Sequence, residues 1–111
     1  MIKKLTEKYI KAFNDKDLEV IKILLSDDFI LEDPIVKKVK GKQKCLEVII
    51  GIFKNYNKLN FSAKNIYIDG NISCIEFILK LDDIVLQGVD ILEFNGKKIK
   101  ELRAYLDIPK G

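Results

Sequence analysis

The chain contains no histidine, and its two cysteines, Cys45 and Cys74, stand far apart in the sequence. Without histidine, a Ser-His-Asp triad and a Cys-His dyad are excluded. A zinc site is nearly excluded as well, because neither cysteine has a CxxC partner. We therefore expect no metal and no cofactor, and we expect both cysteines to serve in ordinary packing.

Arginine and long apolar runs are also scarce. Of the 20 basic residues only Arg103 is arginine, and the net charge is a mild +3. Because bidentate recognition of bases and phosphates favours arginine, the composition argues against a nucleic-acid reader. No segment has the apolar length of a signal peptide or of a bilayer span. We therefore expect a cytoplasmic protein with no membrane contact and no nucleic-acid partner.

The remaining composition is that of one ordered domain over residues 1–111. The chain is 48% hydrophobic and 33% charged, with two prolines and six glycines. This length supports a single hydrophobic core, and the low proline and glycine content argues against disordered segments.

The first half of the chain has the pattern of three helices and one short strand. Helical spacing of apolar residues predicts helices over residues 3–14 and 18–25, the second capped by Asp17. A strand over residues 29–32 ends at Asp33, because the residue before a proline is held extended. Residues 37–42 are interpreted as a basic loop, either simply solvated or able to hold an anionic ligand. A third helix is predicted over residues 43–57.

From residue 60 onward the pattern alternates between apolar and polar residues. It predicts four strands, over residues 60–68, 72–81, 84–94 and 98–107, separated by turn signals. Helices followed by long antiparallel strands indicate an α+β fold. Gly88, inside the third of these strands, favours a sheet that bends around the helices.

The alternation assigns one face of the long strands to a concave interior. Its members are Ser73, Ile75, Phe77, Leu79, Leu81, Leu86, Gly88, Asp90, Leu92, Phe94, Leu102, Ala104 and Leu106. The opposite face also carries apolar residues, including Val85, Val89 and Ile91. A partner subunit is the simplest cover for that face, so we expect a homodimer through the outer sheet face.

Three polar residues stand out against this apolar background: Tyr9, Asp33 and Asp90. Burial penalises a charged carboxyl, so we expect the pKa of Asp90 to be raised, leaving a neutral donor, and Asp33 at a strand end to stay ionised. Taken singly, Tyr9 is an ordinary core residue and Asp33 an ordinary turn former. Taken alone, Asp90 is explained equally well as a carboxyl group at a strand end or as the partner of a lysine or of Arg103 in an ion pair. Together they amount to a general base and two hydrogen-bond donors.

The segments that carry these residues resemble bacterial ketosteroid isomerases. The opening half of that family is matched by YIKAFNDKDL (9–18), LLSDDF (24–29) and LEDP (31–34). Its closing hairpin is matched by VDILEFNG (89–96) and KELRA (100–104). The similarity extends over nearly the whole chain. It places the chain in the nuclear-transport-factor-2-like (NTF2-like) superfamily, which also includes SnoaL-type polyketide cyclases.

The resemblance implies a cone-shaped NTF2-like fold, with three N-terminal helices packed in a strongly curved, mainly antiparallel β-sheet. It also implies a role for each residue, with Asp33 as general base and with Tyr9 and a protonated Asp90 as donors to a dienolate oxygen. This is the mechanism of ketosteroid isomerase itself, in which an apolar site keeps a carboxylic acid neutral. The implied activity is a proton transfer next to a carbonyl of a small apolar ligand. The alternatives are a SnoaL-like cyclase acting on another substrate and a non-catalytic small-molecule-binding or dimerisation module.

One departure from the family pattern concerns the residue that supports the oxyanion donor. Family enzymes carry a tyrosine on the third helix for this purpose, and Ile49 falls near that position. Tyr56, Tyr67 and Tyr105 are the candidates to replace its hydroxyl group.

Overall fold

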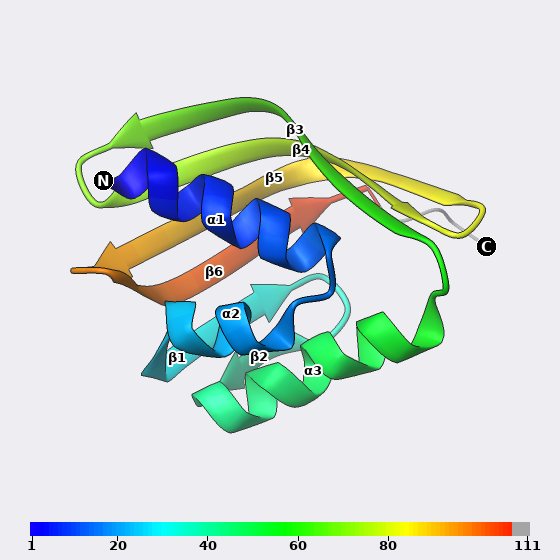
Figure 1. The fold of residues 1–111 in the computed structure, drawn as a ribbon, viewed down its shortest axis with the longest axis horizontal. Helices are drawn as coiled ribbons and strands as arrows, with labels where there is room; N and C mark the ends of the chain where they lie inside the picture. The colour runs from blue at the N-terminus through cyan, green and yellow to red at the C-terminus, as the bar shows by residue number, and fades with distance from the viewer. Residues whose placement is uncertain (108–111) are drawn as a thin grey trace.

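The computed structural model describes residues 1–107, in which three helices lie against the concave face of a curved sheet (Figure 1). The helices are α1 (Ile2–Asn14), α2 (Leu18–Leu24) and α3 (Lys42–Asn55). The strands are β1 (Leu25–Asp33), β2 (Lys37–Lys40), β3 (Leu59–Asp69), β4 (Ile72–Leu81), β5 (Ile84–Asn95) and β6 (Lys98–Leu106). The predicted α+β fold, with three helices inside a mainly antiparallel sheet, is confirmed.

The strands of the described residues form one sheet in the order β2-β1-β6-β5-β4-β3. Every neighbouring pair is antiparallel except β1 and β6, which run parallel. The last strand, β6, therefore lies between β1 and β5. It joins the first half of the chain to the second.

The concave face of the sheet and the inner sides of the helices form the core. The alternation predicted from the sequence is confirmed for the interior positions. Those that are buried are Ser73, Ile75, Phe77, Leu81, Leu86, Asp90, Leu92, Phe94 and Leu102. Three others on this face are partly buried and pack against the core: Leu79, Ala104 and Leu106.

Polar contacts fix both ends of α1 to the sheet. The buried Thr6 hydroxyl oxygen lies 2.8 Å from the Ile2 carbonyl oxygen and 2.9 Å from the Ser73 hydroxyl oxygen on β4. At the other end, the Phe61 backbone N–H on β3 donates to Asn14 Oδ1 at 2.8 Å. Because buried polar groups need partners, these bonds specify where α1 sits on the sheet.

A lysine side chain ties the third helix to the first. Lys16, just after α1, donates from Nζ to the carbonyl oxygens of Phe53 at 2.9 Å and Tyr56 at 2.5 Å. These carbonyls lie at the C-terminus of α3, where backbone acceptors have no partner within the helix. A positive charge is favourable there because the helix dipole is negative at that end.

Two boundaries predicted from the sequence are wrong. The segment expected to be a basic loop contains β2, which pairs residue by residue with the second half of β1. Of its side chains only Val39 is half-buried, and exposed lysines are a common way to protect an edge strand from further pairing. In addition, β1 begins at Leu25 rather than Phe29, because Leu25 pairs with Ile99 of β6.

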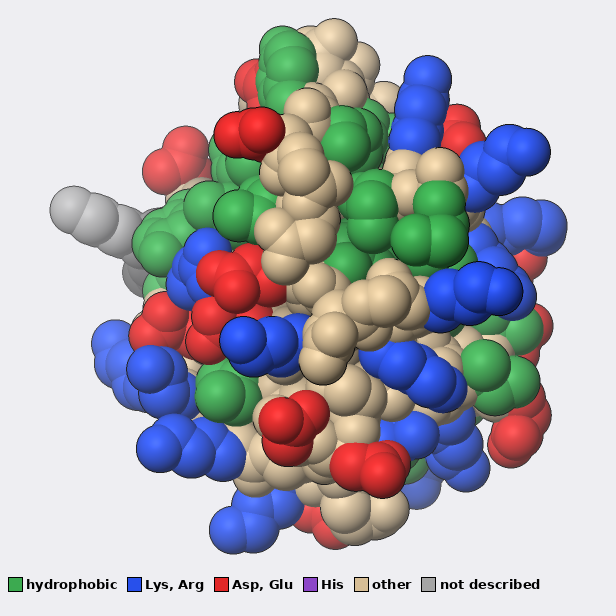
Figure 2. All heavy atoms as spheres, turned by 90° about the vertical axis from the view of Figure 1, so that its left-hand side faces the viewer, with side chains coloured by type: hydrophobic (Ala, Val, Ile, Leu, Met, Phe, Trp, Pro, Cys, Tyr) green, Lys and Arg blue, Asp and Glu red, His purple; other side chains and the backbone are tan. Residues whose placement is uncertain are grey.

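The surface in Figure 2 is the end of the molecule that carries the N-terminus. Hydrophobic side chains gather in its upper part, where β3 and β4 lie, and lysine, aspartate and glutamate side chains mix below. Exposed apolar residues include Met1 and Ile68. Each described helix is too short or too polar to cross a lipid bilayer.

Gly88 allows β5 and β6 to approach each other closely. It lies opposite Leu106, and a Cβ atom built on Gly88 would overlap the Tyr105 carbonyl oxygen and come within 2.7 Å of the Leu106 Cα. Both are backbone atoms, so no change of side-chain rotamer could relieve the overlap. The glycine predicted to permit sheet bending is therefore required by this strand pair.

We expect Gly88→Ala to lower the free energy of unfolding by about 1–3 kcal/mol, because the added methyl group overpacks against backbone. Gly51→Ala is the matched control, since Gly51 lies in α3 and a Cβ there meets nothing within 4 Å. That change is expected to stabilise the protein by roughly 0.5–1 kcal/mol through the helix preference of alanine. Urea unfolding of both variants measures these two changes in the free energy of unfolding. A Gly88→Ala protein as stable as the parent would contradict the packing argument.

Candidate functional site

An apolar cavity of about 190 Å³ lies between the helices and the concave face of the sheet. Its walls come from α1, α3, β1 and the strands β3 to β6. Most lining side chains are hydrophobic: Phe13, Leu25, Phe29, Leu31, Ile35, Ile49, Ile52, Phe61, Phe77, Leu79, Leu81, Leu86, Leu102, Ala104 and Leu106. The remaining four are Tyr9, Asp33, Tyr56 and Asp90. The three residues singled out in the sequence therefore line the same cavity.

Asp90 reaches the cavity from the middle of β5. It is 6% exposed, and no hydrogen bond joins its carboxyl group to another described residue. Burial and, to a smaller extent, the negative charge of Asp33 together raise its pKa from 3.8 to about 7. A carboxyl group with this pKa is mostly protonated below about pH 7, and in that form it can donate a hydrogen bond.

The alternative interpretation of Asp90 as a partner of Arg103 is wrong. Arg103 Nη1 donates to Glu93 Oε1 at 2.8 Å and to Glu101 Oε2 at 2.5 Å. These three residues alternate with the inward-facing positions of β5 and β6 and so lie on the outer face of the sheet. The arginine therefore leaves the interior carboxyl without a countercharge.

Asp33 reaches the cavity from the last position of β1. Its Oδ1 accepts hydrogen bonds from the backbone N–H groups of Ile35 at 2.8 Å and Val36 at 2.7 Å. This is an Asx turn that follows Pro34, so the turn-forming interpretation holds together with the cavity position. Two such donors fix the orientation of the carboxyl group. The second oxygen of the carboxylate makes no hydrogen bond to the described residues.

Tyr9 reaches the cavity from α1 and is held by aromatic packing. It is 4% exposed, and its ring centroid lies 6.0 Å from that of Phe13 and 6.4 Å from that of Phe61. Burial raises the pKa of its hydroxyl group well above 10, and the nearby Asp90 raises it further. The hydroxyl therefore keeps its proton, and it makes no hydrogen bond to another described residue.

The family of the chain follows from comparison with known proteins. Residues 6–102 match the model of the SnoaL-like domain. The chain belongs to the SnoaL-like domain family. None of the curated proteins compared with this chain matches it significantly.

Solved structures share the fold of this SnoaL-like domain at low sequence identity. A candidate ketosteroid isomerase from Kribbella flavida has a TM-score of 0.84 and 20% identity, over 99% of this chain and 80% of that one. A candidate SnoaL-like polyketide cyclase from Shewanella denitrificans has a TM-score of 0.83 and 18% identity, over 96% and 90%. A protein of unknown function with a cystatin-like fold from Xanthomonas campestris has a TM-score of 0.87 and 19% identity, over 96% and 91%. The NTF2-like fold class is thereby confirmed.

The tyrosines considered as replacements at the Ile49 position fall in different places. Ile49 lines the cavity of the SnoaL-like domain, as the resemblance implied, and so does Tyr56 at the end of α3. Tyr67 and Tyr105 are 57% and 56% exposed, and the Tyr67 hydroxyl donates to Glu76 Oε1 at 3.1 Å. Only Tyr56 therefore adds a fourth polar group to the cavity.

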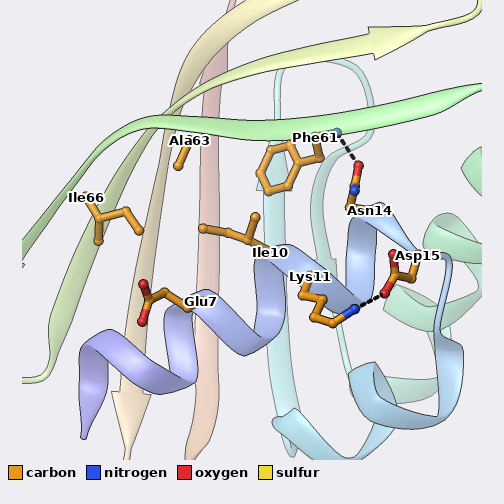
Figure 3. Close-up of a pocket in the computed structure, with 8 residues that line it drawn as sticks. All are labelled: Glu7, Ile10, Lys11, Asn14, Asp15, Phe61, Ala63 and Ile66. Carbon is orange, nitrogen blue, oxygen red and sulfur yellow. Dashed lines mark hydrogen bonds and ion pairs between the residues drawn. The ribbon is translucent and has the colours of Figure 1, made fainter.

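A second hollow of the SnoaL-like domain lies between α1 and β3 (Figure 3). Its polar groups are largely paired with one another. Lys11 Nζ lies 2.6 Å from Asp15 Oδ2, and Asn14 accepts the Phe61 N–H. None of the three residues singled out in the sequence lines it. This hollow lacks buried donors such as Tyr9 and Asp90, which line the apolar cavity, so it is the weaker candidate site.

The raised pKa of Asp90 has a measurable effect on stability. Between pH 3.8 and about 7 the folded state holds this proton more tightly than the unfolded state does. The contribution of Asp90 to the free energy of unfolding therefore falls as pH rises through this window, by at most roughly 4 kcal/mol. We expect Asp90→Asn, which cannot ionise, to gain stability relative to the parent between pH 4 and pH 8.

Urea unfolding at several pH values measures this difference. Asp83→Asn is the matched control, because Asp83 is an exposed carboxyl between β4 and β5. Its stability should follow that of the parent at every pH. Parallel pH profiles for the parent and Asp90→Asn would show that Asp90 does not carry the raised pKa.

Proposed function

We propose that this SnoaL-like domain is a cofactor-free enzyme that transfers a proton next to a carbonyl of a small apolar ligand, through a dienolate. The observation that carries this proposal is the cavity itself. Two donors that make no hydrogen bond to the described residues, Tyr9 and Asp90, line the same apolar space as a carboxylate, Asp33. Such a set is suited to stabilising negative charge on an oxygen while a nearby base takes a proton.

The proposed reaction is an isomerisation of a β,γ-unsaturated ketone. Asp33 takes the proton from the carbon between the carbonyl and the double bond, and the electron pair of that C–H bond moves toward the carbonyl oxygen. The Tyr9 hydroxyl and the Asp90 carboxyl donate hydrogen bonds to the resulting dienolate oxygen. Asp33 then returns the proton to the γ carbon, so that the ketone becomes conjugated and the enzyme is unchanged.

The electrostatics of the pair of carboxyls support this sequence. The charge on Asp33 is one cause of the raised pKa of Asp90. When Asp33 accepts the substrate proton, the negative charge moves from Asp33 to the dienolate oxygen. The charged species then accepts the hydrogen bonds of Tyr9 and Asp90, and a low-dielectric cavity strengthens those bonds. The donors are in place before the charge arrives, which is the condition for effective stabilisation.

A SnoaL-like cyclisation is the second candidate, because proton transfer beside a carbonyl also begins such a reaction. Similarity to a candidate polyketide cyclase and to an LEH-like epoxide hydrolase from M. tuberculosis indicates that this fold accommodates several chemistries. A non-catalytic ligand-binding module is the third. Turnover of a defined ketone separates the first candidate from the other two.

We expect the protein to convert a β,γ-unsaturated ketone into its conjugated enone, followed by ultraviolet absorbance. Asp33→Asn removes the base and is expected to lower kcat by about 10²–10⁴-fold. Glu32→Gln is the matched control, because Glu32 precedes Asp33 on β1 and does not line the cavity. Its kcat should equal that of the parent.

The pH dependence of the same assay tests the role of Asp90. Its pKa of about 7 predicts that kcat falls above pH 7 as the donor loses its proton. Asp90→Asn keeps a donor that does not titrate, so its activity should be independent of pH in that range. Absence of turnover with preserved ligand binding would favour the non-catalytic module, and turnover unchanged in Asp33→Asn would refute the proposed base.

We also propose that a second copy of the chain covers the outer face of the sheet. Val85 and Tyr105 on this face are 54% and 56% exposed. On the same face Arg103 pairs with Glu93 and Glu101, which limits repulsion between two copies. An isologous dimer would bury these apolar side chains against their own copies.

We expect sedimentation equilibrium to give twice the chain mass of 12.8 kDa. Tyr105→Lys should yield a monomer, because it places a charge in the apolar contact. Ile23→Lys is the control, since Ile23 is similarly exposed, at 60%, but lies on α2. A monomeric parent protein, or a dimer in both variants, would refute this interface.

A further inference from the structure

The size of the cavity limits what it can enclose. Its volume is about 190 Å³. An apolar cavity of about 150 Å³ in another protein encloses one benzene molecule, so about 190 Å³ holds roughly eight non-hydrogen atoms. That is one six-membered ring with one or two substituent atoms. By the same proportion, the four fused rings of a steroid need more than twice this space.

The charge of the lining limits the ligand as well. Among the described residues, 1–107, no lysine or arginine lines the cavity, whereas Asp33 contributes a carboxylate and Asp90 is protonated only up to about pH 7. An anionic ligand would therefore meet a negative charge in an apolar space, without a countercharge. A carboxylate or phosphate group on the ligand must stay outside, so the enclosed part is neutral.

The exposure of the lining residues orients the ligand. Tyr9 and Asp90 are 4% and 6% exposed and so lie in the buried part of the lining. Ile35 is 68% exposed, and Tyr56 and Leu106 are half-buried, so these three form its rim. The carbonyl oxygen of the ligand therefore points inward, toward Tyr9 and Asp90. Any further substituent of the ligand ring extends outward past the apolar rim.

We propose that the site takes a neutral single-ring ketone and excludes fused-ring steroids. This inference rests on the proposed function for the identity of the reacting group, and on the volume and charge of the cavity for the size of the ligand. A cyclohexenone with its double bond β,γ to the carbonyl is the minimal substrate of this class. Ala104 sets the limit next to the donors, because it lies directly opposite Asp90 in the β5–β6 pair and lines the cavity.

Binding of phenols tests the size limit separately from turnover. A phenol resembles the planar dienolate and donates or accepts at the same oxygen. At pH 6 we expect calorimetric titration to show phenol binding at least about tenfold more tightly than a four-ring phenolic steroid, a difference of about 1.4 kcal/mol. A steroid that binds as tightly as phenol or more so, or the failure of both to bind, overturns the inference.

A variant whose larger side chain fills part of the cavity tests whether phenol binds there. Ala104→Leu adds three carbon atoms beside Asp90 and is expected to abolish phenol binding. Ala63→Leu is the matched control, because Ala63 lines only the hollow between α1 and β3, and this variant should bind phenol like the parent. Thermal unfolding confirms that both variants fold, and phenol affinity unchanged in a folded Ala104→Leu protein overturns the inference.

The substrate comparison separates the two proposals. Turnover of 3-cyclohexen-1-one with a kcat/KM at least about tenfold above that for a 3-oxo-Δ5 steroid supports both of them. A preference for the steroid overturns the single-ring inference and leaves the isomerase proposal standing. If neither ketone is converted but phenol binds in the expected order, the isomerase proposal fails and the size limit stands.

Discussion

A carboxyl group buried without a countercharge, Asp90 in the centre of the sheet, is the constraint on which the candidate site depends. Ionising it in an apolar interior is unfavourable, so the fold keeps it protonated near neutral pH. The other carboxyl group that lines the cavity among the described residues, Asp33, is held by two backbone N–H groups at the end of β1. Burial thus sets the protonation of Asp90, while two backbone N–H groups fix the orientation of Asp33. An acid and a base from the same residue type then coexist in one cavity.

The contacts that place α1 serve the same site. Thr6 fixes the first part of the helix to β4, and Asn14 fixes its last residue to β3. Tyr9 lies between these two anchors, with its ring packed on Phe13 and Phe61. A hydroxyl group held in this way loses little conformational freedom when a ligand binds, so more of the binding energy remains available. Residues remote from the cavity therefore contribute to its geometry.

Much of the fold could be predicted from the sequence because its periodicity is strong. Helical spacing of apolar residues predicted the three helices. Alternation of apolar and polar residues predicted the four long strands and the position of Asp90 on the interior face. Resemblance to a known family added Tyr9 and Asp33, which are ordinary residues when each is considered alone. Their position on one cavity is confirmed, while their catalytic roles stay a prediction.

What could not be predicted depends on contacts between distant parts of the chain. The strand β2 is rich in lysine and becomes a strand only because β1 offers it a partner. The early start of β1 depends on β6, which lies more than sixty residues later. The partners of Arg103 depend on which face of two neighbouring strands each glutamate occupies. Cavity volume depends on how side chains from seven helices and strands meet, and no local sequence pattern predicts it.

The position of β6 in the sheet has a consequence for how the protein is made. Asp33 on β1 and Asp90 on β5 are separated in the sheet by β6, which follows both of them in the chain, so they cannot be joined in one sheet until β6 has emerged. The N-terminal helices and β1 can form local structure earlier, but their cavity wall remains incomplete. Joining β1 to β6 closes a long loop, and such non-local pairing is expected to be a slow step in folding. The nascent chain would therefore acquire its binding cavity only after β6 has emerged.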